Sequence, residues 1–281
     1  MLNKALYPSP LRYPGGKTCL FDQVKEIIEL NLLNGIGYAE PFAGGAGLAL
    51  SLLIDNIVSQ IYLNDLDSAV FAFWSSTLEE TSELCRMIMD TQVTIEEWHR
   101  QKYILSYPSG YSLLELGFAT FFLNRTNRSG IIEGGVIGGK KQTGDYKLDC
   151  RFNKNELIHR IESIAKRKKD ISLTRFDASE FITEVVNNST RECLSFIDPP
   201  YYKKGRELYF NSLNHKEHLK LSLIIQNELR GPWIVTYDDV PEIKVMYASS
   251  PMVRYSINYS AHVKKKGCEV MYHSPNLQIP E

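Results

Sequence analysis

The stretch "SFIDPPYY", residues 195–202, combines groups that could hold a planar base by an exocyclic amine. The lone pair of such an amine is delocalised into the ring, so the nitrogen is a poor nucleophile until acceptors hold its hydrogens. Asp198 supplies one acceptor. The Pro199 carbonyl could supply another, because Pro199 and Pro200 restrict the backbone and leave no competing donor. Tyr201 could stack on the base, a contact worth about 1 to 3 kcal/mol.

This motif ends an apolar run at 193–201, which we predict to be a strand of a parallel sheet. Ligands of such sheets bind at the carboxyl ends of the strands, which favours a functional interpretation. A sharp turn with tyrosines facing solvent is the alternative. Transfer of a group to the held amine from an activated sulfonium would need positioning and charge stabilisation in a dry site, and no basic nucleophile.

A glycine cluster, "EPFAGGAG" at 40–47, lies between a short strand and a helix-like run. We expect its glycines to let the backbone approach a ligand. Gly45 and Gly47 match two positions of the dinucleotide fingerprint, but Leu50 replaces its third glycine, so a nicotinamide site is weakly indicated. Asp65 ends the next strand, where it could accept hydrogen bonds from ribose hydroxyls or serve as an ordinary cap. Together these features indicate an adenosine-containing cofactor.

The segment "LRYPGGKT" at 11–18 imitates the end of a phosphate-binding loop, but Leu11 stands where that motif requires glycine. We therefore exclude a nucleoside triphosphate site. Lys17 lies in the predicted first helical turn, where the helix dipole favours anions rather than cations. We expect Lys17 to meet a carboxylate, for instance that of a bound amino-acid moiety.

Short strand-like runs alternate with helix-like periods along most of the chain. This alternation predicts an α/β fold with a mostly parallel sheet and helices on both faces. The predicted strands are 37–45, 60–65, 170–177, 193–201, 232–239, 252–258 and 268–274, and the predicted helices are 17–33, 46–55, 66–78, 153–167 and 215–229.

The exception is the gap from about 78 to 169, which is helical up to Leu123 and then polar and glycine-rich. Six glycines fall within 130–144, a composition that predicts a mobile or substrate-moulded loop rather than a core element. Basic charge also concentrates here, with twelve Lys and Arg against six Asp and Glu between Asn124 and Asp170 in a chain of net charge −1. This asymmetry could present one face to a polyanion, although a solvated loop surface is the simpler alternative.

The 281 residues suffice for one α/β domain with an insertion. The five cysteines are far apart and form no C-x-x-C pair, so we expect neither a disulfide framework nor a metal site. No apolar run is long enough to span a bilayer, so we expect a soluble, cytoplasmic protein.

The ordered set "LRYPGGK", "EPFAGGAG", "LNDLD", "FLNRTNRSG", "CRFN" and "DPPY" resembles the Dam-like DNA adenine-N6 methyltransferases over nearly the whole chain. The resemblance implies a Rossmann-like seven-stranded sheet, a catalytic domain at 1–77 and 153–281, and a target-recognition insertion at 78–152. It implies S-adenosylmethionine as cofactor and a catalytic Asp198-Pro199-Pro200-Tyr201 motif that accepts a flipped adenine. The residues it places at the cofactor are Tyr13, Lys17, Glu40, Phe42, Gly44, Gly45, Gly47, Asp65, Asp177 and Asp198.

An enzyme of this kind acting on a duplex must extrude the target nucleotide, at a cost of a few kcal/mol that DNA contacts must offset. We expect these contacts from the basic segment and from residues after the catalytic motif: Arg125, Asn127, Arg128, Lys140, Lys141, Arg151 and Lys203, with Lys204, Arg206 and 264–266 as further backbone contacts. Relatives specific for GATC usually carry an arginine where this chain has Glu133. We therefore do not transfer GATC specificity, because a glutamate suits an amino donor such as cytosine better than guanine acceptors.

The sequence thus predicts a monomeric DNA adenine-N6 methyltransferase that acts on double-stranded DNA. A cognate restriction endonuclease is a candidate partner. Two alternatives stay open: methylation of another amine, such as cytosine N4 or an RNA base, and a catalytically silent DNA-binding regulator. The intact acid and glycine loop disfavour the silent regulator, since a protein that only binds needs neither.

Overall fold

A computed structural model of the chain describes residues 8–13, 15–203, 213–259 and 265–280, with the backbone alone at 256–259 and 265–268. Among the residues described, no helix has the length and apolarity needed to cross a membrane.

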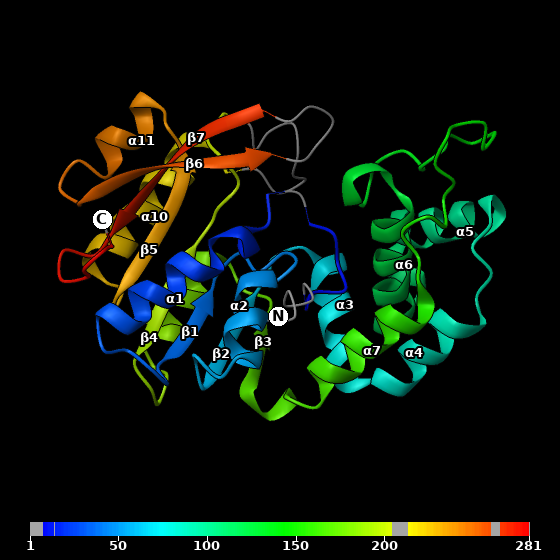
Figure 1. Cartoon of the computed structure of the whole chain (residues 1–281), viewed down its shortest axis with the longest axis horizontal. Coiled ribbons are helices and arrows are strands. Elements are labelled where there is room, and N and C mark those ends of the chain that lie inside the picture. The colour runs from blue at the N-terminus through cyan, green and yellow to red at the C-terminus, as the bar shows by residue number, and fades with distance from the viewer. Residues whose placement is uncertain (1–7, 14, 204–212, 260–264, 281) are drawn as a thin grey trace, which may run out of the picture.

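Seven strands within the described ranges form one sheet in the order β3-β2-β1-β4-β5-β7-β6 (Figure 1). All neighbours from β3 to β5 are parallel, whereas β7 is antiparallel to both β5 and β6. This arrangement confirms the predicted Rossmann-like seven-stranded sheet. The strands are β1 (Gly37–Glu40), β2 (Gln60–Asn64), β3 (Ile171–Thr174), β4 (Cys193–Ile197), β5 (Trp233–Asp238), β6 (Met252–Tyr259) and β7 (Lys265–His273).

The strand order reverses at β1, which lies between β2 and β4. The chain leaves β1 and β4 toward opposite faces of the sheet, so a crevice opens beyond their carboxyl ends. Both motifs that the sequence singled out, "EPFAGGAG" after β1 and "DPPY" after β4, begin at this point.

The five predicted helices are found close to their predicted ranges. The predicted helix at 17–33 opens with a 3₁₀ turn, Lys17–Leu20, and continues as α1. The helices are α1 (Phe21–Leu30), α2 (Gly47–Ile54), α3 (Ser68–Glu79), α4 (Thr81–Asp90), α5 (Ile95–Ser106), α6 (Leu113–Thr126), α7 (Lys154–Ala165), α8 (Ala178–Glu180), α10 (His215–Asn227) and α11 (Pro241–Met246). Side-chain caps mark the starts of α3, α5, α6, α7 and α10.

The central strands are buried along their whole length, since helices cover both faces of the sheet. One core cluster joins the sheet around β1, β2 and β4 to α1, α2, α3 and α6. A second lies between β5, β7, α10 and α11. Helix α6 is buried nearly all round because it packs between α3 and α5, and its aromatic residues Phe118, Phe121 and Phe122 are covered completely.

Helices α4, α5 and α6 lie together at one side of the sheet, where α7 packs against α4 (Figure 1). Every strand of the sheet falls outside 78–152, the range of the predicted insertion. The division into a catalytic domain and a recognition insertion stays a prediction.

The glycine-rich loop after α6 differs from its predicted character. Its turns are closed by backbone hydrogen bonds such as Gly130 N to Asn127 O (3.2 Å) and Gly139 N to Val136 O (3.2 Å). Val136 forms a bridge with Asn127 and is only 3% exposed, so the loop contributes to the core rather than lying wholly outside it.

Asn124 of α6 joins this loop to the N-terminal segment. Its side-chain oxygen accepts a hydrogen bond from Arg12 N (2.8 Å), and its amide donates to Arg12 O (2.9 Å) and Gly130 O (2.8 Å). Gly130 has φ +76°, and a Cβ built on it would lie 1.9 Å from Arg12 O. Only glycine therefore fits where the loop meets the N-terminal segment.

Replacing Gly130 by alanine should destabilise the fold by about 1 to 3 kcal/mol, because the new Cβ clashes with backbone and the φ angle is unfavourable. Gly135→Ala is the matched control: it lies in the same loop, has no positive φ, and its Cβ would meet nothing within 4 Å. Urea unfolding of both variants measures the difference. Equal stability of the two would contradict this account of the junction.

Candidate active site

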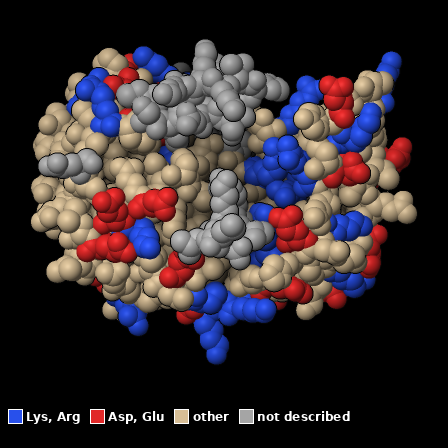
Figure 2. All heavy atoms as spheres, viewed as in Figure 1, with Lys and Arg blue, Asp and Glu red and all other residues tan. Residues whose placement is uncertain are grey.

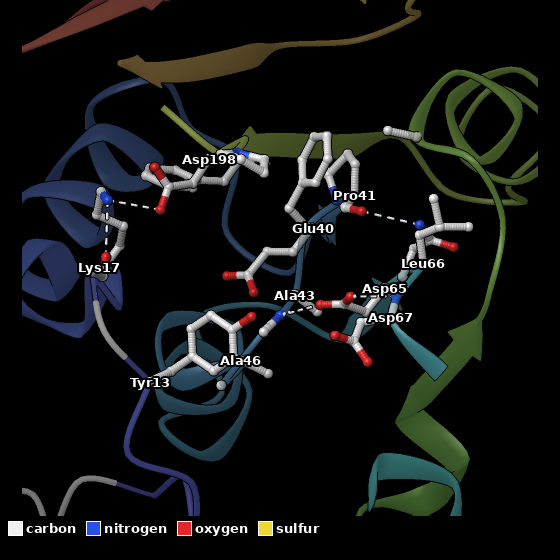
Figure 3. A pocket seen from close by; sticks show the side chains of 18 of the residues that line it. Tyr13, Lys17, Glu40, Pro41, Ala43, Ala46, Asp65, Leu66, Asp67 and Asp198 are labelled. Atoms are coloured by element: carbon white, nitrogen blue, oxygen red, sulfur yellow. Dashed lines mark hydrogen bonds and ion pairs between the residues drawn. The ribbon is translucent and has the colours of Figure 1, made fainter. Parts of the chain in front are cut away.

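A cavity of about 450 Å³ lies beyond the carboxyl ends of β1, β2, β3 and β4 (Figure 3). Its walls come from the N-terminal segment, the loop after β1, the residues that follow β2, β3 and β4, and the first turns of α10. All ten residues expected at the cofactor line it: Tyr13, Lys17, Glu40, Phe42, Gly44, Gly45, Gly47, Asp65, Asp177 and Asp198. Lys17 and Asp198 meet at one side of the cavity, and Asp65 and Asp67 lie at the other (Figure 3).

The glycines of the loop after β1 allow a close contact within the protein. A Cβ on Gly44, which has φ +45°, would lie 2.6 Å from the Tyr13 ring, and one on Gly47 would lie 2.2 Å from Thr18 Oγ1. These glycines therefore let the N-terminal segment pack onto the loop. Gly44, Gly45 and Gly47 also line the cavity, and their predicted close approach to a ligand stays a prediction.

Asp65 fastens this loop to the end of β2. Its Oδ2 accepts a hydrogen bond from Gly44 N (2.8 Å), and its Oδ1 accepts one from Asp67 N (3.0 Å). Burial raises the pKa of Asp65 to about 7 against the effect of these two donors. Each carboxylate oxygen has a second lone pair, so Asp65 can still accept from a ligand in the cavity.

Asn64 was not predicted as a site residue, yet it connects three walls of the cavity. Its amide donates to Pro41 O and Phe176 O (3.0 Å each), and its oxygen accepts from Phe176 N (2.8 Å). These bonds hold the segment after β3 beside the cavity, where Asp177 is exposed and accepts from Ser179 N (2.9 Å). In the sequence, only the position of Asn64 directly before Asp65 indicated a role at the site.

Asp198 is held from two sides at the end of β4. Lys17 Nζ donates to Asp198 Oδ2 (2.7 Å), and Thr236 Oγ1 donates to Asp198 Oδ1 (2.6 Å). Burial raises the pKa of the Asp198 carboxyl, and Lys17 opposes this rise. Lys17 thus meets a carboxylate as predicted, but the carboxylate is that of Asp198.

Lys17 is almost fully buried, with 5% of its side chain exposed, and it faces further groups. Glu269 Oε2 of β7 lies 3.9 Å from Lys17 Nζ and accepts a hydrogen bond from Tyr255 (2.5 Å). Lys17 Nζ also lies over the Tyr201 ring, 5.0 Å from its centroid. Thr236 and Glu269 were not predicted as site residues, because they lie inside strands and their partners are distant in the chain.

Asp238, at the end of β5, fixes the turn that follows the catalytic motif. Its carboxylate oxygens accept from Tyr202 N (3.2 Å) and Lys203 N (3.3 Å). The Tyr202 hydroxyl and His215 Nδ1 are 2.8 Å apart, which ties the turn to the start of α10. Pro200 lines the cavity together with Asp198, whereas the buried Pro199 is not among its lining residues.

Glu40 ends β1 with its carboxylate inside the cavity (Figure 3). It is 7% exposed, and its Oε1 accepts from the Tyr38 hydroxyl (3.1 Å) and from Ala49 N (3.2 Å). Burial raises the pKa of Glu40 to about 8. Glu40, Asp65 and Asp198 thus give the cavity three carboxyl groups whose ionised forms lack solvation.

Residues 13–266 match the model of the D12 class N6 adenine-specific DNA methyltransferases. The chain belongs to this family. The methyltransferase is also similar in fold to two solved structures. One is a candidate RNA methyltransferase from Pyrococcus horikoshii, at 10% identity and TM-score 0.44 over 93% of this chain and 85% of that chain. The other is a candidate methylase from Haemophilus influenzae, at 11% identity and TM-score 0.37 over 92% of this chain and 99% of that one. No curated protein sequence matches it.

Family membership implies that the methyltransferase uses S-adenosylmethionine. The cavity fits such a ligand in volume and in chemistry, since it offers carboxylates to ribose hydroxyls and to cationic groups, and apolar walls at Phe42 and Phe176. Glu40, Asp65 and Asp177 are the groups that would accept its hydrogen bonds.

The residues expected at DNA lie outside this cavity and in different environments. Arg125 is half-buried, whereas Arg128, Lys140, Lys141, Arg151 and Lys203 are exposed. Lys204, Arg206 and residue 264 lie outside the described residues, and the side chains at 265–266 are not described.

Asn127 requires a correction. It is fully buried: its amide donates to Ile131 O (3.0 Å) and Ile132 O (2.7 Å), and its oxygen accepts from Trp98 Nε1 (2.7 Å). Both amide hydrogens are thus engaged within the protein, so Asn127 shapes the loop after α6 instead of facing DNA. The motif around Asn127 did not indicate this pairing, because Trp98 lies 29 positions away in the chain.

The raised pKa of Glu40 predicts how stability depends on pH. The folded protein binds the Glu40 proton more tightly than the unfolded chain does, so this residue's contribution to stability is complete below about pH 4.5 and is lost as the pH rises toward about 8. Glu40→Gln does not titrate. From pH 5 to pH 9 we therefore expect Glu40→Gln to gain stability relative to the unsubstituted protein, by at least the roughly 1.4 kcal/mol that corresponds to one pKa unit. Urea unfolding of both proteins at each pH measures the change, and a constant difference would show that Glu40 has an ordinary pKa.

Proposed function

We propose that the protein transfers a methyl group from S-adenosylmethionine to the N6 amine of adenine in double-stranded DNA, and that the target base is flipped into the site. The observation that best supports this is Asp198, a carboxylate fixed by Lys17 and Thr236 at the mouth of the cavity that Asp65 and Glu40 also line. Family membership supports adenine N6 as the acceptor.

Asp198 is suited to accept hydrogen bonds from the adenine amine. A carboxylate offers about four lone-pair sites, and Lys17 and Thr236 occupy one on each oxygen. The remaining sites can take an amine hydrogen, and the Pro199 carbonyl provides the second acceptor. Held this way, the amine nitrogen directs its lone pair out of the ring plane and becomes a better nucleophile.

Lys17 and Thr236 keep Asp198 ready for this task. Lys17 stabilises the ionised carboxylate against its burial, and Thr236 fixes the rotation of the carboxylate plane. When bound, S-adenosylmethionine supplies an electrophilic methyl group on a sulfonium. As the amine gains positive charge during transfer, the carboxylate of Asp198 and the carbonyl of Pro199 stabilise that charge.

Tyr201 and the basic surface supply the remaining parts of the proposal. Tyr201 stacks on the flipped base, a contact that offsets part of the cost of unstacking. Arg128, Lys140, Lys141, Arg151 and Lys203 are exposed and can contact the DNA backbone.

Methyl transfer separates this proposal from its rivals. The protein is incubated with labelled S-adenosylmethionine and with unmethylated DNA or RNA, and the nucleic acid is digested to nucleosides. We expect N6-methyladenine from duplex DNA. N4-methylcytosine or label in RNA alone would assign another substrate, and absence of label with retained DNA binding would indicate a silent regulator.

Asp198→Ala should reduce methyl transfer by at least about 100-fold, because it removes the acceptor that activates the amine. Affinity for duplex DNA should change little. Asp55→Ala, which removes an exposed carboxylate at the end of α2, is the control and should methylate normally. Normal methylation by Asp198→Ala would refute the catalytic assignment.

Thr236→Val should lower the rate of methyl transfer by about tenfold, the effect of one lost hydrogen bond of about 1.4 kcal/mol. Thr236→Ser keeps the hydroxyl and should recover most of the rate. Single-turnover rates at saturating cofactor and DNA compare the three proteins. If serine is as slow as valine, packing rather than the bond to Asp198 explains the effect.

A further inference from the structure

Four arginines from three separate parts of the chain form an arginine cluster: Arg12 of the N-terminal segment, Arg125 of α6, Arg151 in the loop before α7, and Arg160 within α7. Burial and the charges of the other three arginines lower the pKa of Arg125 to about 9. Burial and the charge of Arg151 lower the pKa of Arg12. In the space-filling view, Lys and Arg gather in the hollow between the sheet and the helices α4 to α6 (Figure 2).

The cluster has little negative charge of its own. Glu156 pairs with Arg160, and the other hydrogen bond of that guanidinium goes to Ser9 O (3.1 Å). Within the described residues, three buried guanidinium nitrogens have no hydrogen-bond partner: Arg12 Nη1, Arg125 Nε and Arg160 Nε. Buried donors without partners and like charges brought together both destabilise the fold.

The unpaired donors and like charges destabilise the folded protein, and binding of an anion by the cluster would explain why they are present. The guanidinium fork matches the oxygens of a phosphate, and partial burial strengthens each such contact. A phosphodiester would neutralise part of the mutual repulsion and accept hydrogen bonds from the unsatisfied donors.

The position of the cluster connects it to the catalytic cavity. Ser9, Leu11 and Tyr13 line the cavity, whereas Arg12, which lies between two of them, does not. Ser9 also accepts the hydrogen bond of Arg160. The segment 9–13 thus lies between the cavity on one side and the arginines on the other.

We propose that the arginine cluster is a binding site for a backbone phosphate of the DNA strand that carries the target adenine. It grips the backbone next to the flipped nucleotide and thereby supplies part of the free energy that extrusion requires. Arg12 and Arg160, which were not predicted as DNA contacts from the sequence, belong to this site with Arg125 and Arg151. The inference rests on the proposed function only in taking DNA as the substrate.

The test measures how binding of a 30-base-pair duplex depends on salt, with fluorescence anisotropy and S-adenosylhomocysteine present. Arg125→Gln and Arg12→Gln should each weaken binding at 0.15 M salt by roughly tenfold and reduce the slope of log affinity against log salt by about 1. The control, Arg86→Gln, removes an exposed arginine of α4 that pairs with Glu83, and should match the unsubstituted protein.

Thermal unfolding without DNA distinguishes a ligand site from a structural role. Removing one of several repelling charges should leave the melting temperature of Arg125→Gln unchanged or raised. A lowered melting temperature together with the affinity and salt slope of Arg86→Gln would overturn the proposal. So would an equal loss of binding by all three variants, because that would reflect net charge alone.

The two proposals can fail separately. Methylated nucleosides report on catalysis, whereas the salt slope of duplex binding reports on the phosphate contact. If the variants lose affinity for an RNA duplex but not for a DNA duplex of the same length, the cluster binds a different nucleic acid and the inference is wrong.

Discussion

The buried ion pair between Lys17 and Asp198 is the contact on which the rest of the site depends. The two residues are 181 positions apart in the chain, so the pair forms only when the N-terminal segment lies across the ends of β1 and β4. Gly44 and Gly47 allow that path because larger residues would collide with Tyr13 and Thr18. The pair also opposes the rise in the pKa of Asp198 that burial causes.

Two neighbouring regions around the site differ in the charge of their buried groups. Inside the cavity, Glu40 and Asp65 have raised pKa values, which suits a ligand that brings positive charge and hydrogen-bond donors. Outside it, Arg12 and Arg125 have lowered pKa values, which suits a ligand that brings negative charge. The acidic and basic regions are separated by the segment 9–13, so the proposed cationic cofactor and anionic strand can approach Asp198 from different sides.

The sequence predicted the fold and the wall of the cavity well because both depend on local patterns. The motifs "EPFAGGAG" and "DPPY" and the residue Asp65 each follow a predicted strand. Because the carboxyl ends of parallel strands meet at one edge of the sheet, the three were expected to lie together. The residues that support them were not predictable in the same way. Thr236 and Glu269 lie within strands, and their partners are distant in the chain, so only the tertiary structure brings them to Asp198 and Lys17.

Asn127 and Arg160 show the same limit of prediction from sequence. Asn127 was predicted to contact DNA and is buried, whereas Arg160 was not predicted and belongs to the arginine cluster. Asn127 lies in a motif that resembles a recognition loop, but Trp98 and the backbone of that loop use its side chain. Arg160 lies in α7, whose sequence predicts an ordinary surface helix, yet its guanidinium donates a hydrogen bond to Ser9 O of the N-terminal segment. A local motif indicates which residues are close in sequence, whereas packing decides which of them face a ligand.

The central claim is that Asp198 holds the amine of the target base. A structure of the protein with a duplex containing its target adenine and a non-reactive cofactor analogue tests this directly. The account predicts the adenine N6 nitrogen within about 3 Å of an Asp198 carboxylate oxygen, with Lys17 still bonded to that carboxylate. An Asp198 side chain turned away from a flipped adenine would contradict it.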